Sequence, residues 1–407
     1  MLRVLVAAVV GASLLLTGCS AGHGSSGSTD TYASVDSTKE AAIIAAIEKS
    51  IPKLGLKSVI VNVRQNDGTI IRKAFGESQT GVPATTDMHF RNGAVAISYL
   101  ANLLLQFVDE GHAQLSDRVS RWLPEVPHAE KVTLQQLAQM TSGYQDYVQD
   151  PTFIEAFLSD PFRFTTTEEQ LAAAAKPLSY PPGTNWSYSH TNYVILGLAL
   201  EKIGGKPLNE LLQEKVLDPL NLNGTTADDN APIPEPALHA FSSERRESLK
   251  IPAGVDFLEE STYWNPSWTL AHGSIQTTNI DDLATTAEAI GTGKLLSDES
   301  FKLMTSTSLR GFGKAQKSCP TCAPQTEAYS YGLGVVTSGN WLFQNPMFGG
   351  YAAVMSYLPD EKISVSVATT LTSNGFDADG VAPNTATELF REIAAIVAPN
   401  NQPPSRK

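Results

Sequence analysis

Residues Phe90 to Gly111 read F-R-N-G-A-V-A-I-S-Y-L-A-N-L-L-L-Q-F-V-D-E-G, and this stretch constrains the fold more than any other. Its apolar residues recur at helical spacing on more than one face, which predicts a helix buried nearly all round. Gly111 follows the last apolar turn, where a left-handed glycine commonly ends a helix. Gly93 precedes the first turn, so the positive end of the helix dipole points at Ala94. A helix N-terminus in a cleft suits a nucleophile or an anion.

The lead F-R-N-G at 90–93 resembles the start of the nucleophile helix in the serine β-lactamase-like superfamily, which includes class C β-lactamases, DD-peptidases and related esterases. In that family a Ser-x-x-Lys motif follows, with the serine as acylated nucleophile and the lysine as its proton partner. Here the serine position is Ala94 and the lysine position is Ile97. Acyl-enzyme formation needs a nucleophilic oxygen beside a proton acceptor, and neither side chain supplies one. We therefore expect the family fold without its acyl-transfer chemistry.

Elements expected elsewhere in the chain agree with this family's architecture. An amphipathic helix with a serine cap is expected first, then a hairpin turning at N-D-G, further β-rich runs and a closing helix. Their ranges are 37–50, 58–65 with 69–75, 331–336, 352–357, 363–370 and 384–397. The expected fold class is α+β, with an antiparallel sheet flanked by N- and C-terminal helices and a mostly helical subdomain.

The resemblance covers residues 39–398, almost the whole body of the chain. It implies that residues 39–90 form the α/β part together with 300–398, and that 91–299 form the mainly helical part. Residues 399–407 are polar and proline-containing, and we expect them to be a disordered tail.

A second family motif, Tyr-x-Asn, aligns with Tyr188 to His190. In the family the tyrosine relays a proton and the asparagine binds the substrate amide. Tyr188 fits the first role, whereas His190 occupies the asparagine position. Alternate side chains on an extended segment face the same way, so both are expected to look into the cleft. His190 then either hydrogen-bonds a ligand or fills the space left by the missing lysine.

The third family motif, His/Lys-x-Gly, lies on the strand that edges the cleft. Counting back from the glycines at 349–350 places its positions near Gln344, Asn345 and Pro346. A proline at a strand edge has no N–H to donate, which weakens substrate pairing there. The aromatic residues Tyr263, Trp264 and Trp268 belong to a region that borders the cleft in relatives, and plain packing is the alternative role for them.

These substitutions favour a non-catalytic cell-envelope protein whose cleft binds a cell-wall peptide or ester, or a protein partner. Two alternatives remain open. In the first, the chain is an active hydrolase of esterase, DD-peptidase or β-lactamase type, with Ser98, Ser189 or Ser274 as a substitute nucleophile. In the second, it is a purely structural surface protein, which a cleft collapsed around Ile97 would favour.

The first residues of the chain indicate export. Residues 1–18 have a short basic start and an apolar stretch that ends in L-T-G before Cys19, which is typical of a bacterial lipoprotein signal peptide. We expect lipidation of Cys19 and a flexible Ser/Gly/Thr-rich tether over 19–38. The body is then expected at the outer face of the cytoplasmic membrane, held there by its lipid anchor.

Cys319 and Cys322, in the run C-P-T-C, are the other two cysteines. An exported protein meets an oxidising compartment, and one such pair has half the thiolates of a zinc site, so a local disulfide is favoured. No metal and no cofactor are expected. The net charge of −13 argues against a nucleic-acid partner.

Overall fold

The computed structural model describes residues 37–66, 68–227, 230–252 and 254–405. The predicted signal peptide, Cys19 and nearly all of the predicted tether lie outside these residues. Within them, no helix combines the length and the apolar character that crossing a membrane requires.

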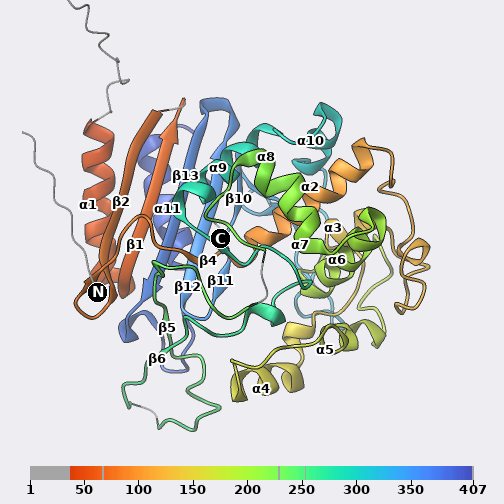
Figure 1. The fold of residues 1–407 in the computed structure, drawn as a ribbon, viewed down its shortest axis with the longest axis horizontal. Coiled ribbons are helices and arrows are strands. Elements are labelled where there is room, and N and C mark those ends of the chain that lie inside the picture. The colour runs from red at the N-terminus through yellow and green to blue at the C-terminus, as the bar shows by residue number, and fades with distance from the viewer. Residues whose placement is uncertain (1–36, 67, 228–229, 253, 406–407) are drawn as a thin grey trace, which may run out of the picture. The chain divides into compact units, whose positions relative to one another are not determined.

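An antiparallel sheet organises the described body (Figure 1). Its strand order is β3-β2-β1-β13-β12-β10-β9-β8, and β11 pairs with β12 alone. The strands are β1 Leu56–Gln65, β2 Gly68–Gln79, β3 Val82–Pro83, β8 Ser330–Tyr331, β9 Val336–Ser338, β10 Trp341–Gln344, β11 Met347–Phe348, β12 Tyr351–Leu358 and β13 Ile363–Leu371. The first and last long strands, β1 and β13, are neighbours, with Val61 opposite Val367. Strands from the two ends of the described chain therefore pair in the middle of the sheet. The predicted antiparallel sheet is confirmed.

The two faces of the sheet bury different cores, because strand side chains alternate between faces. Val59, Val61 and Val63 of β1 join the core formed with α1 (Ser37–Leu54) and α11 (Thr385–Val397). Ile60 points the other way, into the core shared with the helical region. Burying one such side chain stabilises the fold by about 1.5–3 kcal/mol. The expected N- and C-terminal flanking helices therefore lie on one face.

The helical region is built around α2 (Val95–Asp109), in which every residue from Val95 to Leu105 is buried. The other helices are α3 Leu134–Ala138, α4 Pro151–Ser159, α5 Thr167–Leu171, α6 His190–Gly204, α7 Leu208–Leu212, α8 Asp218–Leu220, α9 Ile280–Thr292 and α10 Asp298–Met304. Short strand pairs also occur, β4 Phe90–Arg91 with β7 Thr277–Thr278 and β5 Phe241–Ser242 with β6 Glu259–Glu260. The helix expected after Gly93 begins at Val95, and the F-R lead before it pairs as a strand.

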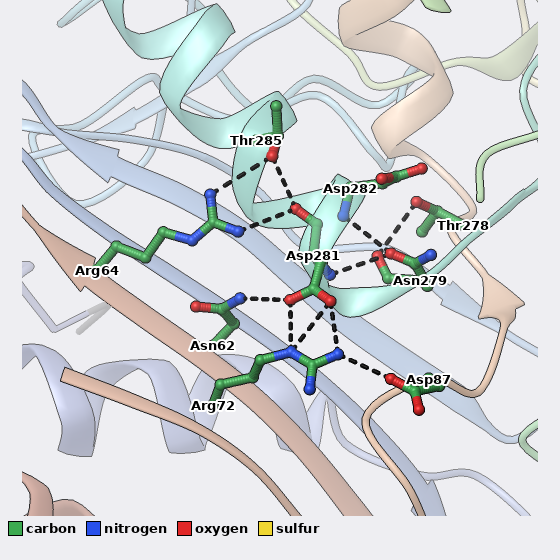
Figure 2. A network of polar contacts seen from close by, with 9 residues as sticks. All are labelled: Asn62, Arg64, Arg72, Asp87, Thr278, Asn279, Asp281, Asp282 and Thr285. Atoms are coloured by element: carbon green, nitrogen blue, oxygen red, sulfur yellow. Dashed lines mark hydrogen bonds and ion pairs between the residues drawn. The ribbon is translucent and has the colours of Figure 1, made fainter. Parts of the chain in front are cut away.

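A polar network fixes α9 on the sheet (Figure 2). Asn279 caps the helix by accepting from the amides of Asp281 and Asp282 at 3.1 and 2.9 Å. The Asp281 carboxylate accepts from Arg72 of β2 at 2.8 and 2.6 Å and from Asn62 of β1 at 2.9 Å. Although α9 falls within the predicted helical part, it covers β1, β12 and β13, because these contacts draw its first turn to the sheet.

The β-rich run 331–336 is not one strand. Gly332 donates to the carbonyl of Val335 at 2.8 Å, so a tight turn separates β8 from β9. Gly334 in this turn has φ +68°, and a Cβ there would meet Cβ of Ala101 at 2.3 Å. The turn therefore packs directly on α2, and only glycine permits that approach.

The predicted disordered tail at 399–407 is wrong for the residues that the structure describes, which extend to 405. The backbone carbonyl of Asn401 accepts from Nε1 of Trp341 at 2.7 Å. Its side-chain amide donates to Glu361 at 2.7 Å. Local composition does not reveal these partners, because they lie far away in the sequence.

Candidate functional site

A cavity of about 350 Å³ lies where α2 begins. It brings together residues from each of the three family motifs, which come from distant parts of the chain, although Ile97 is not among them. Its lining residues are Gly93, Ala94, Tyr188, His190, Trp268, Thr269, Leu270, Tyr329, Gln344, Asn345, Pro346, Met347 and Asn384. The cleft is therefore not collapsed.

The nucleophile position lines the cavity, whereas the lysine position does not. Ala94 is the residue before the first turn of α2 and is partly exposed to the cavity. Ile97 is fully buried in the core and does not line the cavity. A methyl group thus stands where the helix dipole would favour an oxyanion, and no ammonium lies behind it.

Tyr188 and His190 lie side by side at the cavity, with ring centroids 5.1 Å apart. Ser189 between them is extended, with φ −154°, which turns both neighbours to the same side as the alternation predicts. Burial raises the pKa of Tyr188 well above its ordinary value, and neighbouring Tyr329 adds to the effect. At neutral pH this phenol is therefore a neutral hydrogen-bonding group and not a phenolate base.

Asp146 holds His190 and was not singled out by the sequence. Its side chain is only 5% exposed, and its Oδ1 accepts from the His190 amide at 3.1 Å. Both carboxylate oxygens lie 3.2 Å from Nδ1 of the imidazole. Since the two residues are 44 positions apart, no local pattern could have paired them. Asp146 thus fixes the orientation of the imidazole at the cavity.

The residues predicted for the third motif, Gln344, Asn345 and Pro346, also line the cavity. Gln344 donates to the carbonyl of Gly334 at 2.8 Å. Asn384 donates to the carbonyl of Asn345 at 2.8 Å, which fixes the segment between β10 and β11. Pro346 packs on the start of α2, since a Cβ on Gly93 would meet its Cβ at 2.6 Å. The wall is built, although it lacks the cationic side chain that His or Lys would bring.

The three candidate substitute nucleophiles are turned into the protein. Ser98 donates to the carbonyl of Gly334 at 2.7 Å, and Ser274 donates to that of Ala271 at 2.6 Å. Ser189 is 1% exposed. None of the three lines the cavity. A serine hydroxyl is therefore not presented to a ligand there.

Aromatic side chains form much of the cavity wall. Trp268, one of the three aromatics noted in the sequence, lines it and lies 6.4 Å from His190 between ring centroids. Trp264 is buried, and Tyr263 is exposed and does not line the cavity. Tyr329 and Asn384 also line it and were missed. Tyr329 lies in a loop without a recognisable motif, and Asn384 was expected only as the start of the closing helix, which it caps.

Cys319 and Cys322 form a disulfide with their Cα atoms 5.3 Å apart. Thr321 within this loop lies 2.7 Å from Ser187, hydroxyl to hydroxyl, so the loop braces the segment that carries Tyr188. Over the residues described, no group of three or more His, Cys, Asp or Glu side chains is placed to hold a metal ion.

Comparison with known proteins identifies relatives. The sequence model of a family described as "Beta-lactamase" matches residues 43–389. Penicillin-binding protein 4 of Amycolatopsis lactamdurans is 34% identical over 180 residues, 42% of this chain and 44% of that protein. The match thus spans less than half of that relative's length. Protein Rv1367c of Mycobacterium tuberculosis is 25% identical over 68% of this chain and 73% of its own length.

Solved structures show the same fold. A D-stereospecific amidohydrolase from Streptomyces superposes with a TM-score of 0.69 at 23% identity, covering 89% of this chain and 99% of that one. The D-amino acid amidase of Ochrobactrum anthropi SV3 gives 0.71 at 18% identity, covering 88% and 99%. At these identities the similarity concerns the fold alone.

Proposed function

The chain belongs to the beta-lactamase family, and we propose that it binds a ligand in the cavity at α2 without cleaving it. One observation carries the proposal: an open cavity is lined by residues from all three family motifs, and the residue at its nucleophile position is Ala94. The proposed ligand is a cell-wall peptide or ester, and the second possible occupant is a segment of a partner protein.

The lining suits recognition better than acylation. A volume of about 350 Å³ accommodates one residue-sized group, and ligand sites of this kind combine apolar walls with a few placed polar groups. Tyr188 and His190 supply hydrogen-bonding groups, and Trp268 and Leu270 supply apolar surface. The neutral phenol can donate to an amide or ester carbonyl, and Nε2 of the imidazole, whose Nδ1 is held by Asp146, can accept from an amide N–H.

Intact-mass analysis of the full-length protein tests the non-catalytic part of the proposal. The protein is incubated with a penicillin and, separately, with a fluorophosphonate. We expect no adduct on the natural protein and labelling of an Ala94→Ser/Ile97→Lys variant. A stoichiometric adduct on the natural protein would overturn the proposal, and mapping it would identify the nucleophile.

Equilibrium binding tests the ligand site itself. We expect saturable binding of a muropeptide fragment or a short-chain ester, weakened at least tenfold by Tyr188→Phe or His190→Ala, because each removes a hydrogen-bonding group from the site. Tyr263→Phe and His112→Ala are matched controls, since both residues lie outside the cavity. Absence of saturable binding counts against the proposal, as does equal weakening by the controls.

Asp146 favours a second candidate, hydrolysis by a water molecule without an acyl-enzyme. A carboxylate on Nδ1 orients an imidazole so that Nε2 can accept a proton from water. Slow turnover of an activated ester that disappears in His190→Ala, with no mass adduct, would favour this candidate over simple binding. Turnover that survives His190→Ala would exclude it.

We further propose that the protein is exported and anchored through a lipid on Cys19, as the first 19 residues of the sequence suggest. Labelling of bacteria with a radioactive or alkyne-bearing fatty acid tests this. The natural protein should take up the label and sediment with membranes. A Cys19→Ala variant should do neither, and unchanged labelling of that variant would refute the anchor.

A further inference from the structure

A second cavity, of about 290 Å³, adjoins the site. Trp268 and Met347 border both cavities, so the two share a wall. The rest of the second cavity comes from α4, from the segment after β5 and from the loop around Gly380. Its apolar lining residues are Ile154, Phe157, Leu158, Trp268, Met347, Phe348 and Val381.

Aromatic rings that contact one another form part of the surface of this second cavity. Trp268 and Phe348 are stacked, with ring centroids 5.8 Å apart and an interplanar angle of 15°. Phe157 lies 4.9 Å from Trp268 and holds the indole from the α4 side. Such a surface attracts both apolar groups and organic cations.

Glu244 is one of two acidic residues that line this mostly apolar cavity, and it is only partly exposed. No ion pair or side-chain hydrogen bond joins its carboxyl to another residue in the part of the chain that the structure describes. The arginine next to it is already engaged, since Arg245 pairs with Glu259 at 2.9 Å and donates to the carbonyl of Leu158 at 2.6 Å. Asp379, the other acid at the cavity, is exposed to solvent.

We propose that this second cavity binds the ammonium end of the ligand, with Glu244 as counter-ion and Trp268 as aromatic neighbour. The Glu244 carboxyl is partly withdrawn from solvent. A bound ammonium would supply the opposite charge and the hydrogen bonds that its neighbours do not provide. Desolvation, together with the charge of Glu259, raises the pKa of Glu244 to about 7, and a bound cation would lower this pKa again.

This inference rests on the proposed function, because the other end of the same ligand occupies the cavity at Ala94. The ligand class is therefore an amide or ester joined by an apolar stretch to a primary ammonium. Trp268 and Met347 border both cavities, and the apolar stretch of the ligand would pack against their side chains.

Calorimetric titration of the full-length protein at pH 8 tests the inference. The probes are ethyl esters of ω-amino acids with four-, six- and eight-carbon chains, each beside its N-acetyl counterpart, which keeps the ester and removes the charge. We expect at least one amino ester to bind about tenfold or more tightly than its acetylated form, since a charge-assisted contact is lost on acetylation. Glu244→Gln should abolish that preference.

Glu247→Gln is the matched control, because it makes the same charge change three residues away at an exposed position outside the cavity. The control should keep the preference for the amine. Amino and acetylated esters that bind equally well would overturn the ammonium site and leave the proposed function standing. Failure of every probe, charged or neutral, would overturn both.

Discussion

Asp146 accepts two hydrogen bonds from His190, one from its backbone amide at 3.1 Å and one from Nδ1 at 3.2 Å. The first bond satisfies an amide at the start of α6, and the second fixes the imidazole at the cavity. With the Nδ1 proton held by the carboxylate, Nε2 of a neutral imidazole is left as an acceptor. The helix start and the polar group of the site thus depend on one buried acid.

Asp146→Asn should weaken ligand binding and stability together. The amide can cap α6 but is a weaker acceptor for Nδ1, so we expect about 1–2 kcal/mol lower free energy of unfolding. Ligand affinity should fall several-fold, because the imidazole is no longer held in one orientation. Urea denaturation and calorimetry measure the two effects. Asp256→Asn, at an exposed position, is the control, and equal effects in both variants would contradict the prediction.

Gly93→Ala should be more harmful than an alanine at another left-handed glycine. Gly93 has φ +46°, and its added Cβ would lie 2.6 Å from Cβ of Pro346. Gly81 has φ +78° with no heavy atom within 4 Å of such a Cβ, so Gly81→Ala reports backbone strain alone. We expect the free energy of unfolding to fall by about 1 kcal/mol in Gly81→Ala. In Gly93→Ala it should fall by about 1–3 kcal/mol more, because of the clash with Pro346. Chemical denaturation measures both changes. Equal decreases in the free energy of unfolding would contradict the prediction, because they would show that Pro346 moves aside without an energetic cost.

The contact between Arg72 and Asp281 should contribute modestly and depend on salt. It is bidentate, yet the side chains are 39% and 37% exposed, which limits its strength. A double-mutant cycle with Arg72→Ala and Asp281→Ala should give a coupling energy of about 1 kcal/mol, reduced in 1 M NaCl. The isolated pair Lys206–Glu214 serves as comparison and should give less. A coupling unaffected by salt would contradict this account.

Glu244→Gln should stabilise the ligand-free protein at high pH. The pKa of this carboxyl is raised to about 7 in the folded protein. Its ionisation therefore costs the folded state no stability below the ordinary pKa, and the free energy of unfolding falls as the pH rises from there towards 7. Glutamine stays neutral, so the variant should be more stable than the natural protein at pH 8, by roughly 2 kcal/mol, and similar to it at pH 4.5. Urea denaturation at both pH values, with Glu247→Gln as control, checks this. A pH-independent difference would refute it.

Strongly periodic stretches were predictable from sequence because their partners are local or generic. The hairpin formed by β1 and β2 and the buried helix α2 follow from alternation, turn chemistry and an apolar run. Asp67 in the hairpin turn lies outside the described residues. The tail around Asn401 and the turn at Gly334 were mispredicted, since each is held by residues far away in the chain. The same limit applies to Glu244, whose surroundings come from α4 and from the loop at Gly380.

The lack of a nucleophilic oxygen at position 94 and of an amine at position 97 follows from the residue types alone, because packing cannot change the covalent structure of a side chain. The sequence also determined the family motifs and therefore the fold. The packing of distant elements, in contrast, keeps the cavity open, buries Ile97 away from it, and brings Asp146 to His190 across 44 residues. Such contacts depend on how distant elements pack, and local residue preferences carry no record of that packing.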